Sequence, residues 1–123
     1  MDNVISNSLL KNYLHLFDKE GDVKVEEMRT FLGVPKAELA KAFGMSQDQL
    51  RDNRLSSRTM DRLKELAAAL EFVADTFNGD IEKTRFWLNT PNPNFGGATP
   101  KNLILRGRYS KLLKFILAAK QGV

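Results

Sequence analysis

Cysteine is absent from this sequence of 123 residues, which excludes disulfide bonds and metal sites with thiolate ligands. The single histidine, His15, lies between two leucines in a stretch predicted to be helical, so we interpret it as structural. No nucleophile has an activating base at a recognisable spacing, and no residues have the spacing of metal ligands. We therefore predict a protein without enzymatic activity, metal or cofactor.

Long hydrophobic runs are also absent. No run approaches the roughly 20 apolar residues that span a bilayer, and the start Met1-Asp2-Asn3 does not resemble a signal peptide. Hydrophobic residues make up 42% of the chain and charged residues 28%, as in ordinary globular domains. We expect a soluble protein of the cytoplasm.

Strand patterns are missing as well, because no stretch alternates polar and apolar residues for long enough. Apolar residues instead recur every three or four positions, which is the spacing of amphipathic helices. We predict one helix from about Val4 that ends before Gly21, a second over residues 25–32 that ends at Gly33, and a new element opened by Pro35. The predicted fold class is all-α.

The strongest periodicity covers residues 58–77, with Ser56 or Ser57 as the N-cap and an Asn-Gly pair as the stop. This pattern predicts a long central helix. A single apolar stripe usually faces the protein's own core, which we favour, and a homodimer seam is the alternative. A short helix follows, from the predicted cap Asp80 to Leu88.

Residues 36–53 are similar to a helix-turn-helix of the Xre/Cro-repressor type. Ala40 is small where two helices would cross closely, and Gly44 can adopt the left-handed conformation of the turn. Leu39 and Leu50 are expected to bury against the opposite helix. In this geometry the start of the second helix faces the major groove. The predicted DNA-binding residues are Ser46, Gln47, Gln49, Arg51 and Arg54, with the glutamines at base edges and the others at phosphates.

Two carboxylates argue against DNA binding by this motif. Asp48 and Asp52 lie on the same short helix as the predicted base readers, and they would repel phosphates. Asn53 stands where many such motifs have an apolar anchor. The alternative is a helix pair that only packs a small core.

The segment 87–100 combines three prolines, two adjacent glycines and several asparagines. Prolines fix φ, glycines permit positive φ, and asparagine side chains close turns, so the segment should hold one shape. Thr99 followed by Pro100 predicts the N-cap and first residue of a new helix. The predicted structural residues of the loop are Trp87, Pro91, Gly96, Gly97 and Pro100.

Side chains of this loop have different expected roles. We expect the indole of Trp87 to fill the space beneath the loop. Asn92, Asn94 and Phe95 are candidates for partner contacts on its exposed surface, because a stiff loop presents such side chains at low entropic cost.

The order of these features resembles the C-terminal toxin-binding domain of the Xre/MbcA/ParS-type antitoxins, over about residues 30–123. The resemblance implies a partner among the RES-domain toxins, which destroy cellular NAD. It also implies that the C-terminal end, here residues 120–123, enters the NAD-binding cleft of the toxin. The positions that carry it are Trp87, Leu88, Pro91, Asn92, Gly96, Gly97, Pro100, Leu103, Gly107 and the stretch from Tyr109 onward.

Positive charge is concentrated near the C-terminus. Residues 101–123 contain six basic residues and no acidic one, although the net charge of the whole chain is only +4. Such a surface suits an acidic partner, and a solvated helix face with a frayed end is the alternative. The predicted toxin-binding residues are Asn92, Asn94, Phe95, Arg106, Arg108, Lys111, Lys120, Gln121, Gly122 and Val123.

Together these interpretations predict an antitoxin of a type II toxin-antitoxin system. Residues 1–56 would form N-terminal helices and the helix-turn-helix, 57–79 the central helix and 80–123 the toxin-binding domain. The expected partners are a RES-type toxin, operator DNA for autoregulation, and a second copy in a homodimer or a hetero-oligomer with the toxin. The alternatives are a stand-alone helix-turn-helix transcription regulator whose C-terminal lobe mediates oligomerisation, and a structural adaptor.

Overall fold

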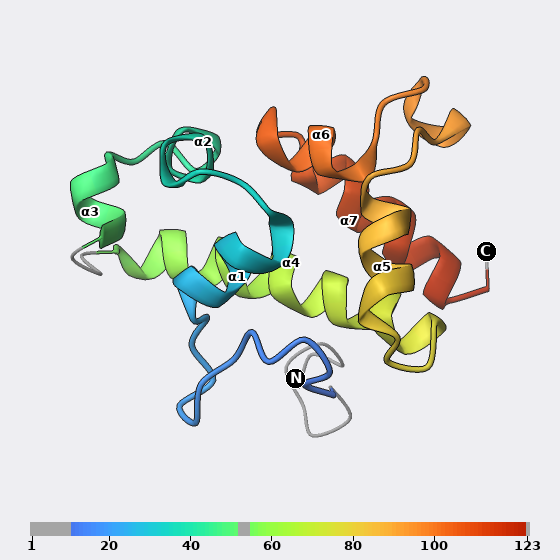
Figure 1. Cartoon of the computed structure of the whole chain (residues 1–123), viewed down its shortest axis with the longest axis horizontal. Coiled ribbons are helices and arrows are strands. Elements are labelled where there is room, and N and C mark those ends of the chain that lie inside the picture. The colour runs from blue at the N-terminus through green and yellow to red at the C-terminus, as the bar shows by residue number, and fades with distance from the viewer. Residues whose placement is uncertain (1–10, 52–54, 123) are drawn as a thin grey trace.

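The long helix α4 (Ser57–Thr76) organises the molecule, as Figure 1 shows for the computed structural model, which describes residues 11–51 and 55–122. The helices α2 and α3 lie over its N-terminal half, and α5, α6 and α7 gather toward its other end. The described part of the chain contains no β-strand, only an isolated bridge between Phe17 and Val23. The predicted all-α fold class is therefore confirmed.

Most predicted helix boundaries are confirmed. The helix α1 (Val25–Leu32) ends at Gly33, which has a φ of 69°, and Pro35 precedes α2 (Lys36–Ala42). Helix α3 (Gln47–Arg51) follows the left-handed Gly44, which has a φ of 68°. Ser56 caps α4 by accepting the backbone N–H of Thr59 at 3.1 Å.

The predicted N-terminal helix is wrong over its described part, and the portion from Val4 to Leu10 lies outside the described residues. Residues 11–24, named the N-terminal strap here, form turns and extended chain. Leu14 and Leu16 are buried while His15 between them is exposed with a φ of 56°, which is an alternation that a helix cannot produce. The expectation of a helical His15 is therefore wrong too.

The cause of this difference is a tertiary contact. The backbone N–H groups of Tyr13 and Leu14 donate to the two carboxylate oxygens of Glu71 on α4, at 2.8 and 2.9 Å. Glu71 thus binds the strap through backbone groups that cannot reach it from the interior of a helix. The apolar spacing of this stretch fitted a helix, but a buried carboxylate far along the chain decided its conformation.

The C-terminal third consists of α5 (Ile81–Leu88), the short 3₁₀ turn η2 (Pro93–Phe95), α6 (Pro100–Leu105) and α7 (Tyr109–Lys120). Helix α7 packs along α4, and α6 packs on both α7 and α2. This region is therefore attached to the helix-turn-helix through α6 as well as through α4.

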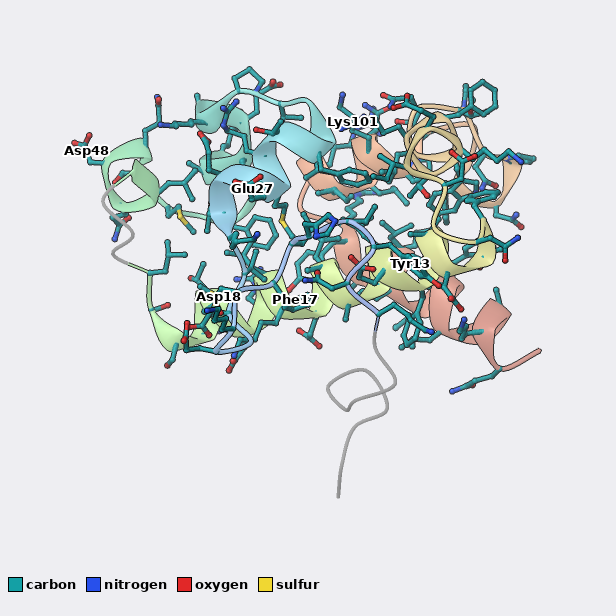
Figure 2. The ribbon with its side chains drawn as sticks, turned by 60° about the horizontal axis from the view of Figure 1, so that its bottom comes forward. Tyr13, Phe17, Asp18, Glu27, Asp48 and Lys101 are labelled. Carbon is teal, nitrogen blue, oxygen red and sulfur yellow. The ribbon has the colours of Figure 1, made fainter. Side chains whose placement is uncertain are left out.

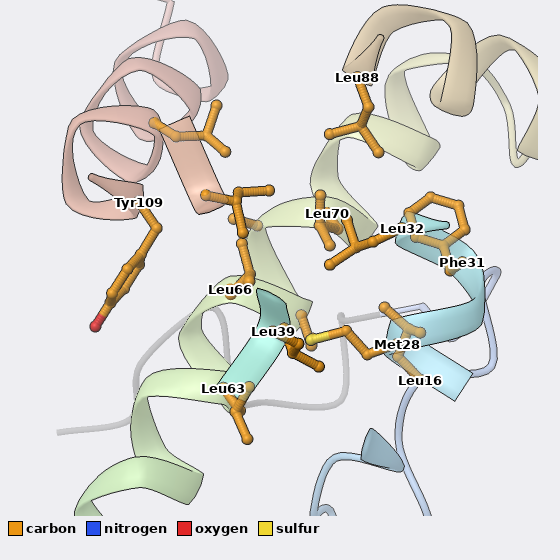
Figure 3. Packing of buried hydrophobic residues seen from close by; sticks show 14 of the residues in the cluster. Leu16, Met28, Phe31, Leu32, Leu39, Leu63, Leu66, Leu70, Leu88 and Tyr109 are labelled. Carbon is orange, nitrogen blue, oxygen red and sulfur yellow. The ribbon is translucent and has the colours of Figure 1, made fainter. Parts of the chain in front are cut away.

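One hydrophobic cluster joins all these parts. Figure 3 shows leucines of α4 in contact range of side chains from α1, α2 and α5, with Tyr109 of α7 at one edge. The prediction that the apolar stripe of α4 faces the protein's own core is confirmed, since Leu63, Leu66 and Leu70 are fully buried. The division at residues 56 and 79 stays a prediction.

Candidate functional site

The loop from Asn89 to Thr99 is held by its own hydrogen bonds. The backbone carbonyl of Asn92 accepts the N–H of Phe95 at 2.9 Å and that of Gly97 at 3.0 Å, and its side chain accepts the N–H of Asn94 at 2.9 Å. The N–H of Asn92 donates to the carbonyl of Ala98 at 3.0 Å and closes the loop base. Asn92 is therefore the residue around which the loop folds, as the turn chemistry of asparagine predicts.

Both ends of the loop are fixed as well. Asp80 caps α5, and at the far end Thr99 and Asn102 form a reciprocal capping box that starts α6 at Pro100. Gly96 and Gly97 have φ values of 65° and 88°, which a residue with a side chain rarely adopts. The loop therefore projects from the helices in one defined shape, at the upper right of Figure 1.

The predicted exposure of Phe95 is wrong. Its side chain is only 5% exposed and meets the ring of Phe115 on α7 edge to face, with centroids 5.1 Å apart. The 3₁₀ turn rotates this ring inward, so that Phe95 is the anchor of the loop. Asn94 is exposed and Asn92 is half-buried, and their contact with a toxin stays a prediction.

Trp87 is only half-buried and packs at the edge of the core. It lines a groove of about 360 Å³ between α4, α5 and α7, whose other walls include Phe72, Phe77 and Phe115. Beneath the loop lies Phe95, so the expected place of the indole is taken by a phenyl ring. Phe86, the neighbouring residue on α5, is 73% exposed.

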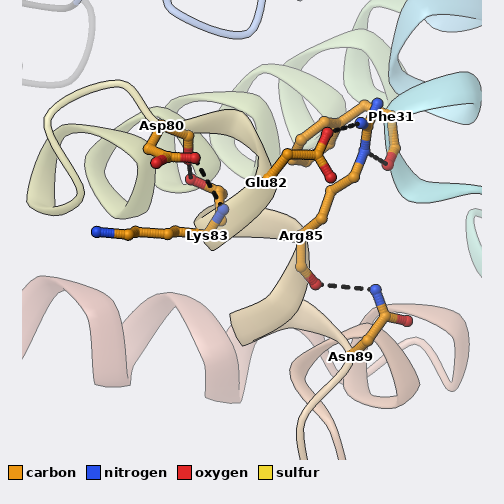
Figure 4. Close-up of polar contacts among 7 residues, drawn as sticks. Phe31, Asp80, Glu82, Lys83, Arg85 and Asn89 are labelled. Carbon is orange, nitrogen blue, oxygen red and sulfur yellow. Dashed lines mark hydrogen bonds and ion pairs between the residues drawn. The ribbon is translucent and has the colours of Figure 1, made fainter.

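Helix α5 is fixed against α1 by one arginine. Figure 4 shows the Arg85 guanidinium between Glu82, to which it donates at 3.1 Å, and the backbone carbonyl of Phe31, at 3.5 Å. The guanidinium also lies 5.4 Å from the centre of the Phe31 ring. The two contacts with Phe31 link the helix that carries Trp87 to α1.

Basic residues surround the corner between α6 and α7. Arg106, Arg108 and Lys111 are all exposed there, and Gly107, with a φ of 73°, makes the turn between the helices. Among residues 101–122 no carboxylate is present to neutralise them. These three of the predicted toxin-binding residues therefore form one exposed positive surface.

The C-terminal end is shorter than the predicted four-residue tail. Lys120 is the last residue of α7, and its ammonium group lies 3.1 Å from a carboxylate oxygen of Asp75 on α4. Only Gln121 and Gly122 follow it within the described residues, and both are exposed. Val123 lies outside the described residues. Lys120 is therefore paired within the chain, and its contact with a toxin stays a prediction.

Three of the five predicted DNA-binding residues lie at the start of α3. Ser46, Gln47 and Gln49 are exposed, and Leu39 and Leu50 are buried as expected. The carbonyl oxygen of the Gln49 side chain accepts the Ser46 N–H at 3.0 Å, while the Ser46 hydroxyl accepts the N–H of Gln49 at 3.2 Å. Both side chains thus form the cap of α3. Neither the Arg51 side chain nor Arg54 belongs to the described residues.

Two further features are absent from the described residues. No group of histidine, aspartate and glutamate side chains there is arranged to hold a metal ion. Within the same residues no helix is both long and apolar enough to cross a membrane.

Residues 73–108 match the family model of the antitoxin Xre/MbcA/ParS C-terminal toxin-binding domain. This segment is similar to an Xre/MbcA/ParS toxin-binding domain. The match begins in the last turn of α4 and ends just before α7, so it contains α5, the whole asparagine-glycine loop and α6. No curated protein and no solved structure matches the chain. The match supports the suspected family over residues 73–108.

Proposed function

We propose that this antitoxin inhibits a RES-type toxin, which consumes NAD, by occluding the NAD-binding cleft of the toxin with its C-terminal end. The family match over residues 73–108 is the observation that supports this most. The exposed surface of the domain fits such a role, because a stiff loop with Asn94 at its tip and the basic α6–α7 corner present contacts that need little ordering.

The test is co-expression with the protein encoded beside its gene. Growth and cellular NAD are measured with the neighbour alone, with the intact antitoxin, and with a variant that ends after Lys120. This truncation keeps α7 and the Lys120–Asp75 ion pair, so only the exposed end is removed. We expect NAD loss with the neighbour alone, full rescue by the intact chain, and reduced rescue by the truncation although the two proteins still co-purify.

A matched substitution tests the basic corner by itself. Charge reversal of Arg108→Glu should weaken the complex and its salt dependence, whereas Lys41→Glu on the exposed side of α2 should not. If the neighbour does not lower NAD, the NAD-consuming toxin is excluded. If the truncation rescues as well as the intact chain, occlusion by the C-terminal end is excluded.

Autoregulation through DNA is a second proposal, favoured by the exposed start of α3 after the left-handed Gly44. We expect salt-sensitive binding to the duplex upstream of its own gene, with a preference over a scrambled duplex. Gln47→Ala should reduce that preference, by about 1–3 kcal/mol for a bidentate contact to adenine. If the protein binds both duplexes equally, or neither, then α2 and α3 only pack the core. If it binds DNA selectively but has no toxin partner, it is a transcription regulator instead.

A further inference from the structure

Helix α4 carries two carboxylates on one face near its C-terminal end. Glu71 and Asp75 are four residues apart and so lie one above the other along the helix. Glu71 is buried, whereas Asp75 is half-exposed. A buried glutamate beside apolar neighbours such as Leu70 and Val73 needs a partner, and each carboxylate has one outside α4.

The N-terminal strap is attached to both carboxylates through Tyr13. Its backbone N–H donates to Glu71, and its hydroxyl donates to Oδ1 of Asp75 at 3.1 Å. The Tyr13 ring lies against Gly79 so closely that a Cβ built there would be 2.6 Å from Cδ1 of the ring. Figure 2 shows Tyr13 on the strap where it passes the end of α4. The hydroxyl is therefore held in a fixed place.

The other oxygen of Asp75 is used by the opposite end of the chain. Lys120 donates to Oδ2 at 3.1 Å, and its ammonium group also lies 5.1 Å from the centre of the Phe72 ring. These two partners favour the charged carboxylate and hold the pKa of Asp75 below its ordinary value, with the bond from Lys120 as the largest cause. One side chain thus joins the strap to the last residue of α7.

We propose that Asp75 is a positioning residue that couples the N-terminal strap to the C-terminal end of α7. A half-exposed ion pair is weak by itself, because two mobile side chains must be held in one geometry. The Tyr13 hydroxyl fixes the rotation of the carboxylate, so that Oδ2 faces Lys120. Its role in inhibition rests on the proposed function, in which the residues after Lys120 enter the toxin.

The coupling can be measured in the free protein, without any toxin. The backbone N–H of Gln121 donates to Leu117 at 3.0 Å and that of Gly122 to Ala119 at 3.2 Å, so their amide exchange rates report opening of the last turn of α7. Tyr13→Phe removes only the hydroxyl, and we expect exchange of both amides about two- to fivefold faster. Asp75→Asn should have at least this effect.

The double variant decides whether Tyr13 acts through Asp75. We expect Tyr13→Phe combined with Asp75→Asn to exchange as fast as Asp75→Asn alone. Asp61→Asn, an exposed aspartate near the start of α4, is the matched control and should leave these rates unchanged. The amide of Phe43 at the end of α2 serves as an internal control for a general loss of stability.

Two outcomes would overturn the proposal. One is an unchanged rate at Gln121 and Gly122 in Tyr13→Phe, and the other is a pair of effects that simply add in the double variant.

A toxin assay then tests separately the role of this coupling in inhibition. Tyr13→Phe should release the toxin about two- to fivefold faster although Tyr13 is no predicted contact. If the intact antitoxin inhibits no toxin, the proposed function fails, while the exchange rates still decide the coupling.

Discussion

The substitution Glu71→Gln tests the contact that fixes the N-terminal strap. The carboxylate of Glu71 accepts two backbone N–H groups, one at each oxygen, and its side chain is 1% exposed. Glutamine has one accepting oxygen, so its NH₂ group would face the second N–H and leave it unpaired. An unpaired buried donor costs about 1–3 kcal/mol. For a chain of this length that is a fall in the midpoint of thermal unfolding of about 3–5 °C per kcal/mol.

The cost of burying the charge of Glu71 reduces the loss of stability expected for Glu71→Gln. Burial raises the pKa of Glu71 above its ordinary value, although the bonds from Leu14 and Tyr13 act in the opposite direction. The folded state therefore binds the proton more tightly than the unfolded chain, so the stability that Glu71 contributes is highest at acid pH and falls as the pH rises through the raised pKa. The difference in the free energy of unfolding between wild type and Glu71→Gln should therefore become smaller as the pH rises.

Urea unfolding followed by circular dichroism measures both effects across the pH range. Glu65→Gln is the matched control, because Glu65 is an exposed glutamate on the same helix. We expect it to change the free energy of unfolding by less than about 0.5 kcal/mol. A Glu71→Gln protein as stable as wild type at neutral pH would refute the reasoning, since the cost of burying the charge would then equal the one hydrogen bond that glutamine cannot accept.

Three further predictions concern the packing and the charges of the same region. Phe95→Ala should cost about 3–5 kcal/mol in urea unfolding, because it removes the buried anchor of the loop, and a loss of under 1 kcal/mol would contradict that role. Gly79→Ala should destabilise the protein more than Gly21→Ala in the same assay. Both glycines have a left-handed φ, but only at Gly79 does a Cβ meet the ring of Tyr13. Equal losses of stability in the two variants would exclude this clash. Because the pKa of Asp75 is lowered in the folded protein, its contribution to stability is present above its pKa in the unfolded chain, about 4, and is lost as the pH falls through its folded pKa. Asp75→Asn should remove this part of the loss of stability in acid, and an unchanged dependence of stability on acid pH would disprove the prediction.

Local chemistry made the helix boundaries and the loop readable from the sequence. Gly33 and Gly44 stand where the chain needs a left-handed residue, Asp80 and Thr99 accept the N–H groups that begin a helix, and Asn92 closes the turn of the loop. Each of these roles depends on neighbours a few residues away, so the sequence pattern contains the information.

The roles of aromatic and charged side chains followed a different rule. Phe95 and Trp87 lie eight positions apart in one segment, and nothing local determines which of the two rings the loop covers. That choice depends on Phe115 of α7, which meets Phe95. The sequence shows Glu71 as a carboxylate within the apolar stripe of a helix, which indicates a buried partner. It does not indicate that this partner is the strap.

The sequence by itself determined the all-α class, the extents of α1, α4 and α5, the starts of α2 and α6, and the similarity of residues 73–108 to a toxin-binding domain, because periodicity, caps and turn residues act over short distances. Only the tertiary structure decided that the N-terminal strap is not helical over its described residues and that Lys120 is paired. Both depend on Glu71 and Asp75, which are more than 40 residues away along the chain. Contacts at such separations form only once distant parts of the chain have packed on α4, so no local pattern records them.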